Sequence, residues 1–207
     1  PARRSPRACV ASSGGGALYL TRPTASALGT TVIRETTLDA NQVLDASGIG
    51  GGAILVEGTP AADATTALRA ELTLVNTTVS GNIVPPSGMA GAGISFSTAD
   101  VTIVSSTIAF NQLAGVGDAA ASGGNLHQGT AVASSLVLRN SIVSNGQRGA
   151  GGASAFIDLY APTGASFNSL DYNGAQHKTP DLNWASGAVE AAAALLALAT
   201  TPGIVPT

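Results

Sequence analysis

The chain has 207 residues, of which 9 are Lys or Arg and 12 are Asp or Glu, giving a formal net charge of −3. This balance excludes nucleic acid as the main partner, because phosphate binding needs a basic face. A hydrophobic fraction of 44% argues against disorder. Membrane insertion of this segment is also excluded, because no apolar run reaches the roughly 18 residues that a spanning helix needs.

A glycine-led phrase recurs along the chain. It reads GGAL, GGAI, GAGI and GGNL, with a truncated fifth copy GGA, at 15–18, 51–54, 91–94, 123–126 and 151–153. A repeat of roughly 20–50 residues is typical of solenoids, propellers or arrays. The chain also begins inside this repeat, which favours a piece of a longer protein.

A second phrase alternates with the first and carries the strand signal. Its copies are TVIRETTLDAN, LTLVNTTVSGN, VTIVSSTIAFN and LVLRNSIVSN, which end at Asn41, Asn82, Asn111 and Asn145. Leu72 and Leu74 alternate with polar or outward positions, a period of two that predicts strands. A second inward residue is expected three places before the asparagine, at Val79, Ile108 and Ile142.

These two phrases predict an all-β parallel β-helix of about four to five coils, with three short strands in each coil. We expect the repeats to span 14–173, after a disordered or truncated tail at 1–13. Residues 174–207 are expected to form a cap or tail, in which the Ala-rich tract Ala188–Thr200 would be a short capping helix.

Equivalent positions in successive coils stack directly on one another, so the repeated asparagines are predicted to form a ladder at one corner. Its members would be Asn41, Asn82, Asn111 and Asn145. A repeated position suits a structural ladder, whereas a catalytic residue is unique in its sequence. We therefore interpret these asparagines as structural.

Few residues point to chemistry. The chain has no G-x-S-x-G motif, and its two histidines lack metal-ligand spacing, so we expect no cofactor and no metal. Two reactive pairs remain open, Glu35 with Asp39 and Asp158 with His127, although solvated surface charge is the simpler interpretation. An ice-binding face would need longer and more regular threonine rows. The weak binding candidates are Arg139, His127, Asp158, Tyr160, Tyr172 and Trp184.

The alternating phrases resemble the right-handed β-helix repeats of polymorphic outer-membrane proteins, whose motifs read GGA[ILV] and FxxN. Gly15–Leu18 and Gly51–Ile54 are similar to the first motif, and Val79-x-x-Asn82 is similar to the second, with an aliphatic residue in place of Phe. The longer phrase also resembles large bacterial extracellular β-helix proteins with variable surface anchors. The resemblance covers roughly residues 14–173 and implies a right-handed helix with an extracellular or cell-surface location.

Both motifs are structural, so the resemblance implies a fold and a location but no activity, and two functions remain as hypotheses. The first is a non-catalytic surface module, a stalk or adhesin-like unit that binds a polysaccharide or a host or cell-surface ligand. The alternative is a carbohydrate-active enzyme, a polysaccharide lyase or glycoside hydrolase, and only under this alternative is calcium a possible cofactor. The Asp-Asp, Gly-His-Gly and Arg-Ile-Lys signatures of β-helix pectin enzymes do not occur in the sequence.

Overall fold

The computed structural model describes residues 9–12, 14–22, 24, 29–44, 50–61, 67–85, 91–114, 124–130, 133–148, 158–162, 166–170 and 173–175. Within these ranges all regular secondary structure is β-strand, and no helix occurs. The expected capping helix at Ala188–Thr200 and the truncated motif at Gly151–Ala153 lie outside the described residues.

The strands form four five-stranded sheets. Sheet A contains β1 (Val10–Ala11), β5 (Gln42–Val43), β9 (Ile83–Val84), β13 (Gln112–Leu113) and β17 (Gln147–Arg148). Sheet B contains β2 (Leu18–Arg22), β6 (Ile54–Gly58), β10 (Ile94–Ser97), β14 (Leu126–Gln128) and β18 (Leu159–Tyr160). Sheet C contains β3 (Thr30–Arg34), β7 (Ala70–Val75), β11 (Ala99–Val104), β15 (Ser135–Arg139) and β19 (Ser166–Leu170). Sheet D contains β4 (Thr37–Asp39), β8 (Thr78–Ser80), β12 (Thr107–Ala109), β16 (Ile142–Ser144) and β20 (Gly174–Ala175).

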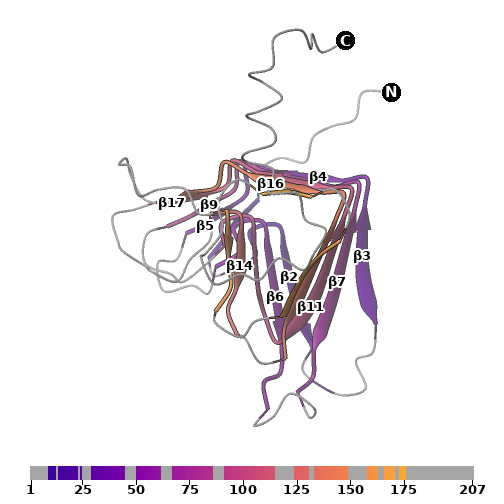
Figure 1. Cartoon of the computed structure of the whole chain (residues 1–207). Coiled ribbons are helices and arrows are strands. Elements are labelled where there is room, and N and C mark those ends of the chain that lie inside the picture. The colour runs from indigo at the N-terminus through magenta and orange to yellow at the C-terminus, as the bar shows by residue number, and fades with distance from the viewer. Residues whose placement is uncertain are drawn as a thin grey trace, which may run out of the picture.

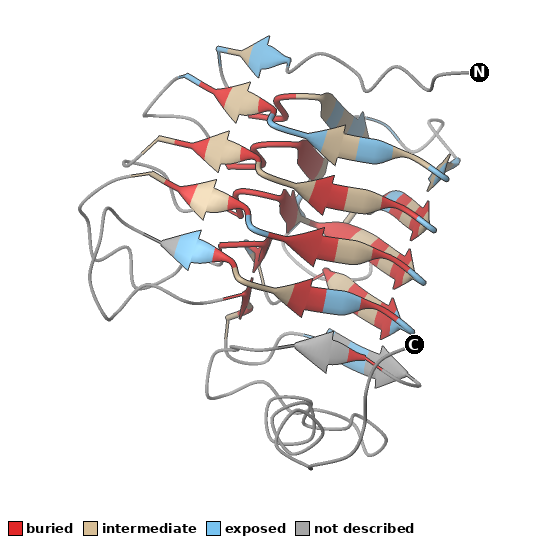
Figure 2. Cartoon of the chain, turned by 90° about the horizontal axis from the view of Figure 1, so that it is seen from above, coloured by how far each residue is buried: buried red, intermediate tan, exposed pale blue. Residues whose placement is uncertain are grey.

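The polypeptide visits these sheets in a fixed order. From β2 onward, successive strands enter sheets B, C, D and A in turn, and every pairing between the named strands is parallel. Figure 1 shows the four sheets around the molecule, and Figure 2 shows the turns of the polypeptide stacked one below another. We call each B–C–D–A turn a coil. The arrangement is consistent with the β-helix solenoid that the repeats predict.

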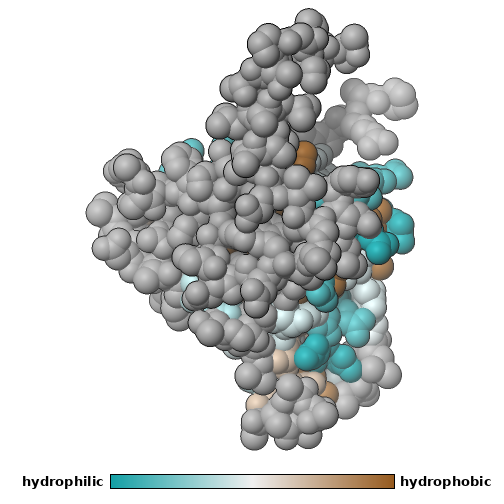
Figure 3. Space-filling model, in the orientation of Figure 1, coloured by the Kyte–Doolittle hydropathy of each residue, from teal (hydrophilic) through white to brown (hydrophobic). Residues whose placement is uncertain are grey.

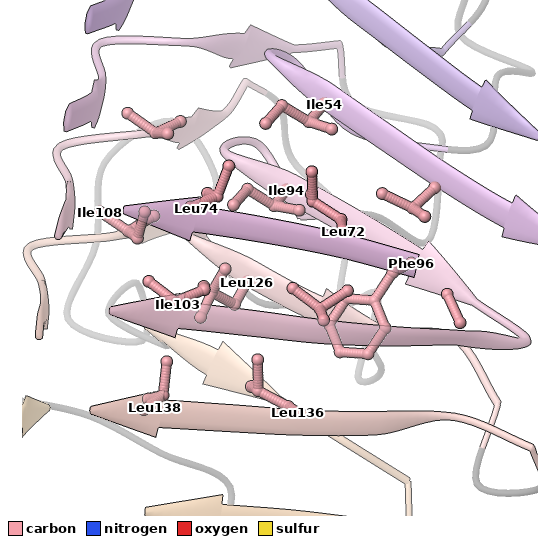
Figure 4. Close-up of a cluster of buried hydrophobic side chains, with 14 of the residues drawn as sticks. Ile54, Leu72, Leu74, Ile94, Phe96, Ile103, Ile108, Leu126, Leu136 and Leu138 are labelled. Carbon is pink, nitrogen blue, oxygen red and sulfur yellow. The ribbon is translucent and has the colours of Figure 1, made fainter. Parts of the chain in front are cut away.

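The interior is filled by aliphatic columns from sheets B, C and D. Leu72, Val101 and Leu136 are in register on neighbouring strands of sheet C and are each 1% exposed. Figure 4 shows Leu72 and Leu136 among rows of side chains between the ribbons, with Phe96 as the largest. Burial of one such aliphatic residue contributes roughly 1.5–3 kcal/mol, so the repeated Leu-x-Leu phrases provide the main driving force for stacking.

Two corners of the coil use left-handed backbone at equivalent positions. Between sheets C and D, Glu35, Asn76, Ser105 and Asn140 have φ values of 50°, 50°, 48° and 48°. Between sheets D and A, Ala40, Gly81, Phe110 and Asn145 have values of 55°, 62°, 57° and 56°. A residue with a side chain is strained in this region, and Gly and Asn tolerate it best. The corner conformation is therefore imposed by stacking, even where the local residue opposes it.

Phe110 provides a test of this strain, because it is 62% exposed and has a φ of 57°. We expect Phe110→Gly to raise the free energy of unfolding by about 1 kcal/mol by relieving the left-handed conformation. Chemical denaturation measures the change. Phe110→Ala is the control, because it removes the exposed ring but keeps a Cβ, and equal gains from both variants would contradict the backbone explanation.

Two features of the coil differ from the prediction. Each of the first four coils has a fourth strand after the corner that follows sheet D, where three strands were expected. These sheet A strands, such as β5 and β9, are two residues long, which is too short for a period of two to show in the sequence. In addition, Val10–Ala11, assigned to an N-terminal tail, pairs in parallel with β5.

Candidate functional site

Three asparagines of the repeat stack at the corner between sheets D and A. The Nδ2 of Asn41 donates to Oδ1 of Asn82 at 2.8 Å, and the Nδ2 of Asn82 donates to Oδ1 of Asn111 at 2.8 Å. The backbone N–H groups of Asn41 and Asn82 donate to the same two oxygens, at 2.9 and 3.1 Å. Each of the three residues is at most 3% exposed. The ladder satisfies these buried amides, which would otherwise destabilise the corner.

The fourth rung differs from the prediction, because it is Asn125 and not Asn145. The Nδ2 of Asn111 donates to Oδ1 of Asn125 at 2.8 Å. Strand register places Gly146 level with Asn111, next to the paired residues Gln112 and Gln147. A Cβ on Gly146 would lie 2.8 Å from Nδ2 of Asn125. Gly146 thus leaves the space that the Asn125 amide fills.

The misplacement comes from counting backward from the last asparagine of each phrase. In the fourth phrase that asparagine comes one residue earlier relative to the Leu136-x-Leu138 pair. Consequently Ile142, predicted to be inward, is 52% exposed, and Val143 is the buried residue at 0%. Val143 is in register with Ile108, which was correctly predicted to be inward.

Asp158 continues the ladder as its fifth rung. Its Oδ1 accepts hydrogen bonds from Nδ2 of Asn125 at 2.8 Å and from the backbone N–H of Gly146 at 2.6 Å. Asp158 is 0% exposed, and it immediately precedes Leu159, which pairs with Leu126. The carboxylate therefore has a structural position within the stack, level with Asn125.

A second ladder of hydroxyl groups lies at the corner between sheets C and D. The N–H of Thr77 donates to Oγ of Ser106 at 3.1 Å, and the N–H of Ser106 donates to Oγ of Ser141 at 3.2 Å. The N–H of Ser141 donates to Oδ1 of Asn173 at 2.8 Å. Each of these hydroxyls donates in turn to the carbonyl two residues before it. The Ser/Thr rows of the repeat thus hold neighbouring coils together.

One outward column on sheet B consists mainly of aromatic and polar side chains. The column runs in register through Tyr19, Leu55, Ser95, His127 and Tyr160. These residues alternate with interior ones, yet Leu55, Ser95 and His127 are only 4%, 2% and 5% exposed. Sheet B is therefore buried on both faces over its central strands.

His127 contacts both of its neighbours in this column. Its ring stacks on Tyr160 with centroids 5.3 Å apart and an interplanar angle of 18°. Its Nδ1 lies 3.1 Å from Oγ of Ser95. The structure brings together two predicted candidates, His127 and Tyr160, and adds Ser95, whereas the predicted partner Asp158 belongs to the corner ladder. The burial of these groups favours packing between coils as their role.

Tyr19 lies at the exposed end of this column and is 52% exposed. Its hydroxyl donates to Oε2 of Glu57, on the strand next to it in sheet B, at 2.6 Å. This hydrogen bond is the main reason that the pKa of Tyr19 is raised above its ordinary value, and burial and the Glu57 charge add to the effect. This hydrogen bond connects the first coil to the second.

The raised pKa of Tyr19 predicts that the Tyr19–Glu57 hydrogen bond depends on pH. A group whose pKa is higher in the folded state stabilises the fold below its unfolded-state pKa and loses that contribution as pH rises through the folded-state pKa. We therefore expect the Tyr19–Glu57 contact to be intact at neutral pH and to weaken in alkaline solution above pH 10.0. An NMR titration of the Tyr19 ring measures this, and Glu57→Ala should lower the pKa of Tyr19.

The outer face of sheet C carries the remaining charged candidates. Arg139 is exposed and aligns with Val104 and Val75 on this sheet, away from the His127 column. At the other edge of the face, Oδ1 of Asp100 contacts Nη1 of Arg69 at 2.7 Å and accepts a hydrogen bond from Ser135 at 2.6 Å. Figure 3 shows hydrophilic and hydrophobic residues mixed along this side of the molecule.

The predicted reactive pair Glu35 and Asp39 falls at structural positions as well. Glu35 occupies the left-handed corner after β3, and Asp39 accepts a hydrogen bond from Oγ of Ser80 at 2.7 Å. Glu71 likewise accepts a hydrogen bond from Oγ1 of Thr30 on the neighbouring strand. The carboxylates of Asp39 and Glu71 thus connect adjacent coils.

Tyr172 and Trp184 lie outside the described residues. Within the described part of the protein, no group of three or more His, Cys, Asp or Glu side chains is arranged to hold a metal ion. The same residues contain no helix with the length and apolarity to cross a membrane.

No family model, curated protein or solved structure matches this sequence. The candidate site therefore depends on geometry alone. Sequence reasoning missed two of its members, Asn125 and Ser95. Asn125 differs from Ala53 and Gly93 at the same position of the glycine-led phrase, which was the available signal. Ser95 is a small residue inside an apolar strand, and no sequence feature distinguished it.

Proposed function

We propose that this protein is a right-handed parallel β-helix module of the bacterial cell surface or extracellular space, and that it is a non-catalytic stalk or adhesin-like unit. The four parallel sheets and the stacked glycine-led and asparagine-bearing phrases support the fold. The resemblance to polymorphic outer-membrane protein repeats supports the location.

One observation carries the non-catalytic part of the proposal. The acidic residues with side-chain hydrogen bonds make them to neighbouring coils, as Glu57 does with Tyr19 and Asp100 does with Ser135. Asp158, the buried acid, accepts two hydrogen bonds inside the corner ladder. Carboxylates that hold coils together are not positioned as an acid/base pair around a glycosidic bond.

The outer face of sheet C is the surface we assign to ligand binding. It is long and regular, and it presents Thr73, Thr102 and Val137 in one column beside Arg139. Hydroxyl groups and an arginine suit a polysaccharide with acidic groups, because arginine pairs with carboxylates in a fork-like geometry. A host or cell-surface glycan of this chemistry is the expected ligand.

Screening the protein against acidic and neutral polysaccharides, with and without calcium, tests the proposal. We expect binding of an acidic polysaccharide without release of shorter products, and a loss of binding in Arg139→Ala. Tyr19→Ala, on sheet B, is the matched control and should bind normally. Release of shortened or unsaturated sugars would overturn the proposal in favour of a carbohydrate-active enzyme.

A further inference from the structure

Two Asn-Gly dipeptides occur in the sequence, Asn145–Gly146 and Asn173–Gly174. Such dipeptides deamidate readily, because glycine has no side chain to hinder ring closure. The glycine nitrogen attacks Cγ of the asparagine, the bond between Cγ and Nδ2 breaks, and the leaving amide takes up the proton of the glycine N–H as ammonia. Water then opens the succinimide to aspartate or isoaspartate.

The attacking nitrogen of the first dipeptide is held in place. The N–H of Gly146 donates to Oδ1 of Asp158 at 2.6 Å, and both residues are buried. A hydrogen bond to a carboxylate in a buried site is among the stronger ones in proteins. Attack on Asn145 requires this bond to break, because the nitrogen must turn from Asp158 towards the Asn145 side chain.

The backbone of Asn145 also opposes ring closure. Its φ of 56° belongs to the left-handed corner that it shares with Gly81 and Phe110 in the coils before it. Closing the succinimide ring needs rotation about the Cα–C bond of Asn145, which would displace Gly146 from its stacked position. The corner conformation and the Asp158 hydrogen bond therefore both oppose formation of the succinimide at Asn145.

From these contacts we propose that Asp158 protects Asn145 from deamidation, so that Asn145 is a covalent modification site that reacts only when the fourth and fifth coils separate. The reaction would put an isoaspartate, and thus an extra backbone carbon, into the stacked corner and prevent the coils from closing again. This inference assigns a chemical role to Asp158 that is independent of ligand binding.

Asn173 provides an internal reference because it is protected by a different contact. Its own side chain is held at both ends, since Oδ1 accepts the N–H of Ser141 at 2.8 Å and Nδ2 donates to the carbonyl of Leu138 at 2.8 Å. Asn173 is 3% exposed. Its protection does not depend on Asp158, so its deamidation reports general opening of these coils.

The test compares wild type, Asp158→Ala and Asp158→Asn after incubation of the folded protein at mildly alkaline pH, with peptide mapping by mass spectrometry. Losing one hydrogen bond to a charged group should speed deamidation at Asn145 by about tenfold in Asp158→Ala. Asp158→Asn keeps an oxygen acceptor and should stay close to the wild type. Deamidation at Asn173 should be unchanged in both variants.

An unchanged or slower reaction at Asn145 in Asp158→Ala would overturn the proposal, and the slower case would identify Asp158 as a base that assists the attack. A parallel rise at Asn145 and Asn173 would overturn it too, because the coils would then open together. Hydrogen exchange of the wild-type Gly146 amide gives a measurement without any substitution. Slow exchange is expected, and exchange at the rate of an exposed amide would contradict the proposal.

Discussion

The double variant Asn125→Gly/Gly146→Asn should recover part of the stability that either single substitution removes. The two residues face each other across one corner, and a Cβ on Gly146 would lie 2.8 Å from both the backbone nitrogen and Nδ2 of Asn125. Asn125→Gly removes the contact with Nδ2, whereas the contact with the backbone nitrogen stays and keeps the recovery incomplete. Moving the amide from one side of the corner to the other reproduces the arrangement of the third coil, where Asn111 faces Gly93.

The same complementarity runs through the stack. Each of the first four coils has one position before its sheet B strand and one position after its sheet D strand that share the corner, and only one of the two carries the amide. The pairs are Ala17 with Asn41, Ala53 with Asn82, Gly93 with Asn111, and Asn125 with Gly146. The ladder needs one amide per coil, and the small partner residue provides its space.

The single variants should each be strongly destabilising. In wild type, Oδ1 of Asn125 accepts from Nδ2 of Asn111, and its Nδ2 donates to the Ser144 carbonyl and to Asp158. Asn125→Gly leaves these buried groups without partners, at a cost of about 3–5 kcal/mol. Gly146→Asn forces a second side chain into the occupied corner, and we expect a loss of similar size.

Urea denaturation of the four proteins measures the coupling. We expect an interaction free energy of about 2 kcal/mol or more in the direction of rescue. Asn145→Gly, which changes the neighbouring asparagine outside the ladder, is the matched control and should alter stability by no more than about 0.5 kcal/mol. Additive losses in the double variant would show that the amide does not act through the corner.

The interior of the fold could be predicted from sequence because its signal is repeated. Leu72, Val101 and Leu136 recur at the same place in successive phrases, and their burial follows from a period of two combined with stacking. Parallel pairing follows from the same repetition, since copies of one phrase can align only when they run in one direction. Burial and parallel pairing are therefore each supported by several copies of the same sequence pattern.

The ladder could not be predicted fully because one coil exchanges its two corner positions. Counting back from Asn145 misplaced that residue and Ile142 by one position, whereas counting forward from Leu136 would have placed Gly146 level with Asn111. A missing amide at Gly146 then points to the unexpected amide at Asn125. The amide of a coil can come from either of two positions that share one corner. Comparing the repeats one position at a time does not reveal this relationship.

The contact between His127 and Tyr160 could not be predicted from the sequence either. His127 and Tyr160 were both singled out as unusual side chains, but their contact depends on the register of β14 with β18. That register pairs Leu126 of the fourth coil with Leu159 of the fifth. Glycine motifs align the earlier coils, and the fifth coil lacks one at the matching position.

Gly52→Ala is expected to cause the largest loss of stability, about 4 kcal/mol or more, and to prevent folding at elevated temperature. A Cβ on Gly52 would lie 2.3 Å from the carbonyl oxygen of Ala92 and 3.0 Å from the backbone nitrogen of Ile83. Both contacts are to backbone atoms, so no side-chain rotation relieves them. Circular dichroism during thermal unfolding measures the effect.

Gly129→Ala is the control for this experiment, because its Cβ would approach no atom closer than 3.5 Å, and it should change stability by less than about 1 kcal/mol. The clash is a property of this register position in more than one coil. Gly16 is level with Gly52 in the first coil, and a Cβ on Gly16 would lie 2.1 Å from the carbonyl oxygen of Gly52. If Gly52→Ala were as stable as the control, the close backbone approach of neighbouring coils at Gly52 could not be what requires a glycine there.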